Sequence, residues 1–422
     1  MSDTNRVQIL YGGEHDGATP RVYTYGVSPT HSSSVGVYST LRTTGESMHQ
    51  ETSTITSAEI RADRQIADVV RSNLSVAGDT GFELSYSFAE LMLAAVMSDQ
   101  ALDSFTDQTG IMDSSAILAI THATNVITES GTGGNFNLMS PGQWVKLSGF
   151  VNNNGYYKIK SITGNSPDMV MTVHGNLVAG DDATSTTATV VQGGQVVNGS
   201  KQRSYTIQRV HTDIDTATSG RAAVYTGCMI DGMTLSATTE AVVTGSFNWL
   251  GAKGASANTE LGTAHVDATN EDVMNSIDDV DGVMEGTTYA SQNITAFTMA
   301  LGNNLRPRLE IGTLGAVAIG TGTCNVSGTF QRYYSDATMI DKYLNFTDSA
   351  LAIVFDDADG NAYCLDFPKI VYTSAQRVAG GQNQDLIADM SWEAIRSDVQ
   401  YDPGTGNVDE GVTIRISKWT GA

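Results

Sequence analysis

The sequence predicts a mainly β fold: two tandem β-sandwich or barrel-like domains, each with one flanking helix, and a small all-β domain inserted into the first. The chain has 422 residues, enough for two or three domains of ordinary size. Only 16% of the residues are charged and 43 are glycine, a composition typical of strand-rich assemblies rather than helical enzymes. Similar strings also recur in the same order in both halves of the chain, which indicates duplication.

The first domain is predicted to comprise residues 1–109 and 200–260. A polar stretch from Ser28 to Thr56 lacks apolar periodicity, so we interpret it as a long loop without core residues. The following residues, 58–86, combine alternation, β-branched side chains and an internal glycine, and this pattern predicts strands.

Two amphipathic stretches predict the flanking helices. In "SFAELMLAAVMS", Ser87 can cap the helix and Glu90 completes a capping box. Ser335 opens the second stretch, "SDATMIDKYL". Each stretch places apolar side chains on one face, namely Phe88, Leu91, Met92, Ala95 and Val96 in the first, and Met339, Ile340, Tyr343 and Leu344 in the second.

The residue pattern changes at both ends of residues 110–199. Short strands alternate there with Asn and Gly turns, and "NNNG" before "YYKIKSI" is a hairpin signal. We therefore expect an inserted all-β domain. An acidic linker over 261–290 and a second large domain over 291–422 are predicted to follow.

The similar strings of the two halves occur in the same order along the chain, so the predicted strands and helices also follow the same order. "IRADRQIA" (60–67) resembles "LRPRLEIG" (305–312), "LSVAGDTGF" resembles "CNVSGTF", and "YTGCMIDGMTLSA" resembles "YCLDFPKIVYTSA". "VVTGSFNW" ends at Trp249 where "LIADMSW" ends at Trp392. Convergent strand composition is the alternative to duplication. If duplication is right, Trp249 and Trp392 occupy matching places, as do Ser87 and Ser335.

The sequence offers no catalytic, cofactor-binding or metal-binding constellation that would identify an enzyme. "DDADGNAY" lacks the Glu that a calcium loop needs at its twelfth position, and its Asp-Gly-Asn centre predicts a tight hairpin turn. His211, Asp213 and Asp215 alternate without a further ligand cluster nearby, which favours a solvated strand end over a metal site. The three cysteines fit no disulfide or zinc pattern, so we expect buried free thiols.

Charge and hydropathy restrict the partners. Acidic residues outnumber basic ones 46 to 23, giving a net charge of −23, so the surface lacks a basic footprint for nucleic acid. This argues against DNA binding but not against DNA as a passing neighbour. The longest apolar run, from Leu91 to Met97, is too short to cross a bilayer, and no signal peptide is recognised. We therefore expect no membrane association and a reducing cytoplasm.

Four stretches together resemble the major tail tube proteins of long-tailed, siphovirus-type bacteriophages. They are "TSAEIRADRQIADVVRSNLSVAGDTGFELSYSFAELMLAAVM", "SYTIQRVHTDI", "VVTGSFNWLG" and "SGTFQRYYSDATMIDKYLNFTDSALAIVF" with the later "LDFPKIVYT". The resemblance implies stacked rings that form a tube around DNA. The apparent doubling implies a form with two fused tube domains, built as trimeric, pseudo-hexameric rings. The inserted domain resembles those that phage tails carry on their outer wall.

The resemblance also implies partners and a role for the long loop. Besides copies of itself, the chain would meet a tape-measure protein, a tail terminator and tail-tip proteins, in a virion tail assembled in the host cytoplasm. The long loop would contact a neighbouring ring, through the candidates Val37, Tyr38, Leu41, Arg42 and Met48. Two alternatives remain: another virion component, at the tail tip or as a capsid decoration, and a carbohydrate-binding β-protein that uses Tyr156 and Tyr157.

Overall fold

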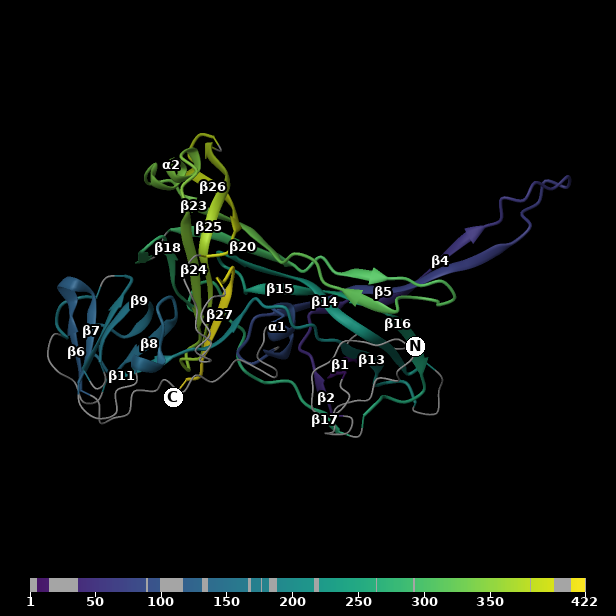
Figure 1. The fold of residues 1–422 in the computed structure, drawn as a ribbon, viewed down its shortest axis with the longest axis horizontal. Coiled ribbons are helices and arrows are strands. Elements are labelled where there is room, and N and C mark those ends of the chain that lie inside the picture. Colours follow the sequence, from purple (N-terminus) through teal and green to yellow (C-terminus); the bar gives the residue numbers. More distant parts are fainter. Residues whose placement is uncertain are drawn as a thin grey trace.

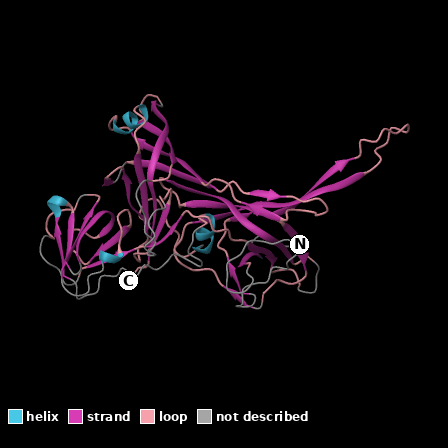
Figure 2. Cartoon of the chain, in the orientation of Figure 1, coloured by secondary structure: helices cyan, strands magenta, loops and turns pink. Residues whose placement is uncertain are grey.

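The computed structural model describes residues 6–14, 37–88, 90–98, 117–130, 136–165, 168–175, 177–181, 188–215, 220–262, 264–290, 293–379, 381–397 and 411–421. These residues form mostly β-strands, as Figures 1 and 2 show. They also form two short α-helices. The predicted mainly β fold is confirmed.

The large sheet is built from two successive sets of strands. The first set is β1 (Val7–Gly13), β2 (Val37–Thr40), β3 (Gly45–Glu46), β4 (His49–Thr56), β5 (Val69–Glu83), β12 (Gly194–Val197), β13 (Tyr205–His211), β14 (Ala222–Thr238), β15 (Thr244–Gly251) and β16 (Lys253–Ala257), with α1 (Glu90–Val96) after β5. The second set is β17 (Ala264–Val266), β18 (Val280–Glu285), β19 (Thr288–Ala290), β20 (Ile294–Gly302), β23 (Asn325–Tyr333), β24 (Ser349–Asp356), β25 (Ala362–Ala379), β26 (Leu386–Ala394) and β27 (Arg415–Trp419), with α2 (Thr338–Leu344) after β23.

The two halves pair their strands in the same way. In the first half β14 pairs with β15 and β15 with β5, and in the second half β25 pairs with β26 and β26 with β23. Trp249 lies opposite Gly78, and Trp392 lies opposite Gly328. A Cβ atom on Gly328 would come within 2.5 Å of the Trp392 indole, so this crossing requires glycine. Both tryptophans therefore hold the same register position.

Irregularities in the pairing also recur. The register of β14 shifts directly after Ile230, opposite Trp249, and that of β25 shifts directly after Tyr372, opposite Trp392. When the halves are aligned on these positions, Tyr225 corresponds to Phe367. The similar strings instead match Tyr225 to Tyr363, which lies four residues earlier. That part of the predicted alignment is wrong because the strings match in composition, whereas cross-strand partners and bulges set the register.

The element order repeats along with the register. The strands of the two halves correspond one to one by their pairings, with β3 and β4 together matching the single strand β20. The correspondences are β1 to β18, β2 to β19, β5 to β23, β13 to β24, β14 to β25, β15 to β26 and β16 to β27. β18 and β19 lie within residues 261–290, where the sequence predicts an acidic linker. The second half of the repeat therefore begins at β18.

The large sheet continues from one half into the other at a central junction, in addition to the pairing of β12 with β27. β14 pairs antiparallel with β20, with Met233 opposite Leu301 and Leu235 opposite Met299. Because β20 also pairs with β23, the sheet runs β4–β5–β15–β14–β20–β23–β26–β25. The two ends of this run are β4 and the C-terminal half of β25.

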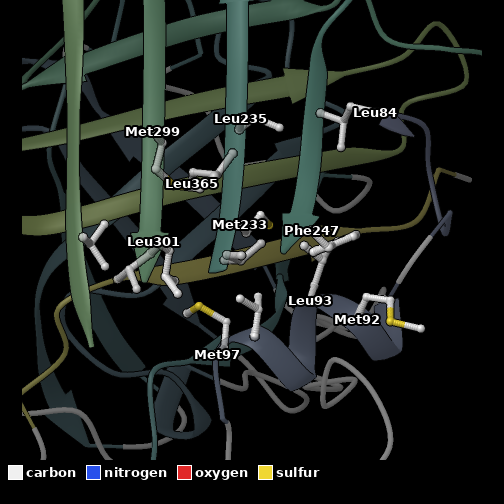
Figure 3. Packing of buried hydrophobic residues seen from close by; sticks show 14 of the residues in the cluster. Leu84, Met92, Leu93, Met97, Met233, Leu235, Phe247, Met299, Leu301 and Leu365 are labelled. Atoms are coloured by element: carbon white, nitrogen blue, oxygen red, sulfur yellow. The ribbon is translucent and has the colours of Figure 1, made fainter. Parts of the chain in front are cut away.

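The two halves share one hydrophobic core. Figure 3 shows Leu93 of α1 below Met233 of β14, Phe247 of β15 and Leu301 of β20. Met299 is 1% exposed and Phe247 is fully buried. Each such side chain contributes roughly 1.5–3 kcal/mol on burial, so neither half is expected to keep its stability alone.

Both predicted helices are present but are shorter than their stretches. α1 and α2 each begin three residues after their serine, at Glu90 and Thr338. The Ser87 hydroxyl donates a 2.8 Å hydrogen bond to the Glu90 carboxylate, whereas Ser335 donates to Asp336. Ala337 holds the N-cap position of α2 without a side-chain bond, so Ser335 precedes this helix without capping it.

The inserted segment folds into a sheet of its own. Its strands, in spatial order, are β11 (Thr189–Gln192), β8 (Trp144–Ser148), β9 (Gly155–Asn165), β10 (Asp168–Val173), β7 (Val126–Ser130) and β6 (Ile117–Thr121). This sheet has its own buried cluster, which includes Leu118, Ile127 and Met171. β12 belongs to the large sheet instead, through its pairing with β27, and the predicted start near Gly110 lies outside the described residues.

Two hairpin arms leave the large sheet at equivalent positions. β4 and β5 extend into the first arm, whose tip is formed by residues 57–68, and Figure 1 shows it reaching far from the body. The second arm is the hairpin of β21 (Arg306–Arg308) and β22 (Ala318–Gly320). The tips carry exposed apolar side chains, with Ile60 100% and Ile66 70% exposed in the first.

Candidate assembly surfaces

The candidate contact residues of the predicted long loop lie mostly inside the chain's own fold. Tyr38 is fully buried, and Leu41 and Met48 are at most 5% exposed. The Arg42 guanidinium donates to the Ser85 hydroxyl and to a backbone carbonyl. Only Val37, 40% exposed, presents substantial surface.

Our interpretation of this segment as a loop without core residues is therefore wrong over residues 37–56, which form β2, β3 and β4. The pattern was missed because buried apolar residues are separated there by long polar runs, without a clean period of two. Ser28 to Gly36 lie outside the described residues.

One face of the large sheet is polar and exposed. Side chains that alternate with the core residues point to this face, and hydroxyl pairs bridge neighbouring strands, such as Thr234 to Ser246 and Thr298 to Thr329, each at 2.8 Å. The charged side chains at the alternate positions of strands β4, β5, β15, β14, β20, β23, β26 and β25 are the carboxylates Glu51, Asp79, Glu83, Asp389 and Glu393. Apart from Lys369 of β25, which alternates with Val371 and forms an ion pair with Asp348, the paired positions on this face carry no lysine or arginine.

The two ends of this sheet have unpaired backbone edges among the described residues. From Val371 to Ala379, β25 pairs with β26 alone. At the other end, residues 45–56 pair with β5 alone. All eight residues of β4 are exposed. Such edges are templates for pairing with another chain.

Three side chains cover part of the second edge. The Glu46 carboxylate accepts a 2.9 Å hydrogen bond from the Met48 backbone N–H and forms a 2.5 Å ion pair with Arg209. The Tyr225 hydroxyl donates to the Met48 carbonyl at 2.9 Å, and Arg209 donates to that hydroxyl. Burial raises the pKa of Tyr225 above its usual value, so this hydroxyl keeps its proton at neutral pH. We call Glu46, Arg209 and Tyr225 the edge cap.

The inserted sheet is fixed to the second half by a buried seam. Trp144 and Tyr156 of the insert pack with Trp419, Cys364 and Ala352 of the second half. Tyr156 is only 2% exposed and its ring lies 5.0 Å from that of Trp419. Burial raises the pKa of Tyr156. The expectation that Tyr156 is exposed, which favoured the carbohydrate-binding alternative, is therefore wrong.

Polar contacts complete the seam. The Lys158 ammonium contacts the Asp366 carboxylate at 2.7 Å, and both side chains are buried. Arg415 lies 3.7 Å from the other carboxylate oxygen, and the Lys146 ammonium donates to the Gly360 carbonyl at 2.7 Å. A cleft of about 550 Å³ flanks this seam, but its Lys158 is already paired with Asp366. The seam is a structural junction.

The motifs considered for chemistry have structural explanations. The predicted tight turn at "DDADGNAY" is confirmed: Asp357 accepts backbone N–H groups of Asp359 and Asn361, and Gly360 has φ of 82°. His211 ends β13, so Asp215 does not share its strand face. Within the described ranges, no group of three or more His, Cys, Asp or Glu side chains could hold a metal ion. Nor does any helix there have the length and apolarity needed to span a membrane.

The fold defines a strand-rich protein with one extended sheet, exposed sheet edges and a projecting arm. A family model described as phage tail tube protein matches residues 4–394. The chain therefore belongs to the phage tail tube protein family, and it is a structural component of the phage tail. No curated protein matches the chain.

The surfaces that sequence reasoning missed are the edge cap and the arm tip. Glu46, Arg209 and Tyr225 come from three strands far apart in the chain, and nothing local marks them. The tip at residues 57–68 did carry a signal, since the charged residues Arg61, Asp63 and Arg64 cluster there without apolar periodicity. The alternation across residues 58–86 nevertheless predicts a strand there.

Proposed function

We propose that the chain builds the tail tube as rings of three copies, in which both halves act as equivalent tube domains. The observation that supports this proposal most strongly is the repeated register around Trp249 and Trp392. The repeat covers β1 to β5 and β13 to β16 in the first half, and β18 to β20 and β23 to β27 in the second. A symmetric ring needs compatible interfaces at every junction, and duplicated halves provide them six times from three chains. In this proposal the first tube domain is interrupted by the insert and the second begins at β18.

The exposed polar face of the sheet is the lumen wall in this proposal. Carboxylates such as Asp79 and Asp389 repel the DNA backbone. The hydroxyl groups of Thr234 and Thr298 make the surface hydrophilic without adding positive charge. Each cationic contact would add affinity for phosphate and slow the passage of DNA. The wall thus suits a conduit, which we infer to have a structural rather than a catalytic role.

The arms link the copies. Inside the chain, the second arm lies along the first half: a Cβ atom on Gly315 would sit 3.2 Å from the Ala252 carbonyl and 3.4 Å from that of Leu74. The tip of the first arm, residues 57–68, has no such support among the described residues, and Ile60 there is fully exposed. We assign to this arm, rather than to Val37 and its neighbours, the contact with a neighbouring copy.

The insert belongs on the outside of the tube. It packs on Ala352 and Val354 of β24, whose neighbours Leu351 and Ile353 face the shared core. The core separates the insert from the polar face, which supports an outer location. The further partners in this proposal are a tape-measure protein, a tail terminator and tail-tip proteins, with assembly in the host cytoplasm before incorporation into the virion tail.

Electron microscopy of the purified chain tests the proposal directly. Negative-stain images should show rings or tubes with a central channel. Deleting residues 59–66 should leave the chain folded, as judged by an unchanged circular dichroism spectrum, but prevent tubes from forming. Isolated globules from the unmodified chain at all concentrations would contradict the proposal, and normal tubes from the deletion variant would contradict the role of the arm.

A further inference from the structure

The internal β14–β20 junction gives a template for the two free edges. Because β25 corresponds to β14 and residues 43–51 correspond to β20, the register of the internal junction can be transferred to them. Gly232 opposite Gly302 becomes Ser374 opposite Glu51, and Thr234 opposite Ala300 becomes Gln376 opposite His49. Leu235 opposite Met299 becomes Arg377 opposite Met48.

The edge cap occupies the positions that are apolar at the internal junction. By register, Glu46 and Tyr225 correspond to Phe297 and Phe367, and Arg209 corresponds to Ile353. Phe297, Phe367 and Ile353 are at most 3% exposed. The three apolar side chains therefore lie beside a strand pair that exists within the chain. The three polar side chains of the edge cap lie beside a strand edge that has no partner strand in the single chain.

The polar trio binds the backbone groups that a pairing strand needs. Ser47 pairs with Asp79 through its N–H, so the N–H and carbonyl of Met48 point to the outer edge, because these groups alternate along a strand. Glu46 and Tyr225 occupy both of them.

We propose that residues 46–51 pair with residues 374–379 of a second copy, and that the edge cap holds Met48 until that strand arrives. This inference rests on the proposed ring. The arriving backbone of Arg377 replaces the cap at Met48, and its guanidinium comes diagonally beside Glu46 on the same face, where opposite charges attract. Arg377 is exposed and lies over the Tyr334 ring at 5.5 Å in the single chain, so it is available for this exchange.

Disulfide trapping in assembled particles tests the register. His49→Cys with Gln376→Cys places two thiols on the polar face in a directly opposed pair, with Cβ atoms about 5 Å apart. Ser53→Cys with Gln376→Cys is the matched control, on the same face but roughly 13 Å farther along the strand. Cys324, the least buried native thiol, is replaced by serine in both.

The expected result is disulfide-linked chains from the His49 pair in rings or tubes, and no more than background linkage from the Ser53 pair. If microscopy shows tubes but the His49 pair stays unlinked or the Ser53 pair links, the edge pairing is overturned while the tube remains. If the unmodified chain forms no ring or tube, the proposed function and this inference both fail.

The cap itself is tested by Tyr225→Phe, which restores the side chain found at the equivalent Phe367. Loss of one hydrogen bond to Met48 should speed assembly, measured by light scattering, roughly 2- to 10-fold. Tyr343→Phe on α2 is the control and should leave the rate unchanged. Equal rates for both variants and the unmodified chain, or a slower rate for Tyr225→Phe alone, would overturn the cap.

Discussion

The internal junction and the two outer edges of the large sheet have the same geometry but opposite chemistry. At the internal junction, Leu235 and Met299 face each other in the shared core. At the corresponding outer positions, Arg377 is exposed and Met48 has its backbone capped by Glu46. Two separate strand edges with exposed apolar side chains would aggregate in water, whereas edges with charged side chains stay soluble. In the proposed assembly, one of the two equivalent junctions is therefore permanent within the chain, and the other forms only between copies.

The largest expected effect comes from truncating the permanent junction. Phe297→Ala should lower the free energy of unfolding by about 3–5 kcal/mol, because it leaves a cavity in the core. Glu46→Ala at the equivalent position of the first half should cost only about 1–2 kcal/mol, since one ion pair and one hydrogen bond are lost. Urea denaturation of both soluble variants measures the difference. Equal losses in the free energy of unfolding would contradict the view that Phe297 lies in a permanent core and Glu46 at an open edge.

The seam with the insert should behave as a second permanent junction. Asp366→Ala leaves the buried ammonium of Lys158 without its carboxylate and should cost about 3–5 kcal/mol. Asp366→Asn keeps a hydrogen-bond acceptor and should cost less. Thermal unfolding of the two variants compares them. A loss below about 1 kcal/mol for Asp366→Ala would mean that the insert is held by the apolar contacts of Trp419 alone.

Charge reversal at the open edge should separate assembly from folding. Arg377→Glu should change stability by no more than about 0.5 kcal/mol, because the side chain is exposed. Assembly should fall at least about tenfold, because the new carboxylate meets Glu46 of the neighbouring copy. Sedimentation velocity measures assembly, with the exposed Lys160→Glu on the insert as a control of equal charge change. Similar loss in both variants would point to net charge instead of edge pairing.

The smallest effect concerns Asp356, whose pKa is raised to about 6 by burial and by the nearby carboxylates of Asp281 and Asp279. The folded chain therefore holds this proton more tightly than the unfolded chain, so stability should fall as the pH rises from about 4 to about 6 and then level off. Asp356→Asn should remove this part of the pH dependence. The gain at pH 7 should be about 1 kcal/mol or less because the group is half-exposed. Unchanged pH dependence of unfolding in the variant would contradict the assignment.

Sequence patterns predicted the features that depend on neighbouring residues. The mainly β fold, the two helices and the turn at Asp357 followed from local propensity and turn chemistry. The repeat was visible because Trp249 and Trp392 each lie opposite a glycine, Gly78 and Gly328. A Cβ atom on Gly328 would clash with the Trp392 indole, and one on Gly78 would clash with the Met48 backbone, so glycine is required at both positions.

Features that depend on cross-strand partners were not predictable. Tyr38 and Met48 are core residues in a segment whose sequence is polar, because only the distant strands that cover them make them buried. The offset of Tyr225 against Phe367 arises from register shifts, which no single string reveals. The edge cap is a difference between two equivalent places, so it emerges only after the halves are aligned by structure.

The number of chains in an isolated ring tests the central claim most directly. Native mass spectrometry of rings released from short tubes counts the 44.7-kDa chains without any assumption about their arrangement. If both halves are equivalent tube domains, the ring contains three chains, and a map of it shows pseudo-sixfold symmetry with Trp249 and Trp392 alternating around the channel. A ring of six chains, in which one half lines the channel and the other lies outside it, would contradict the account.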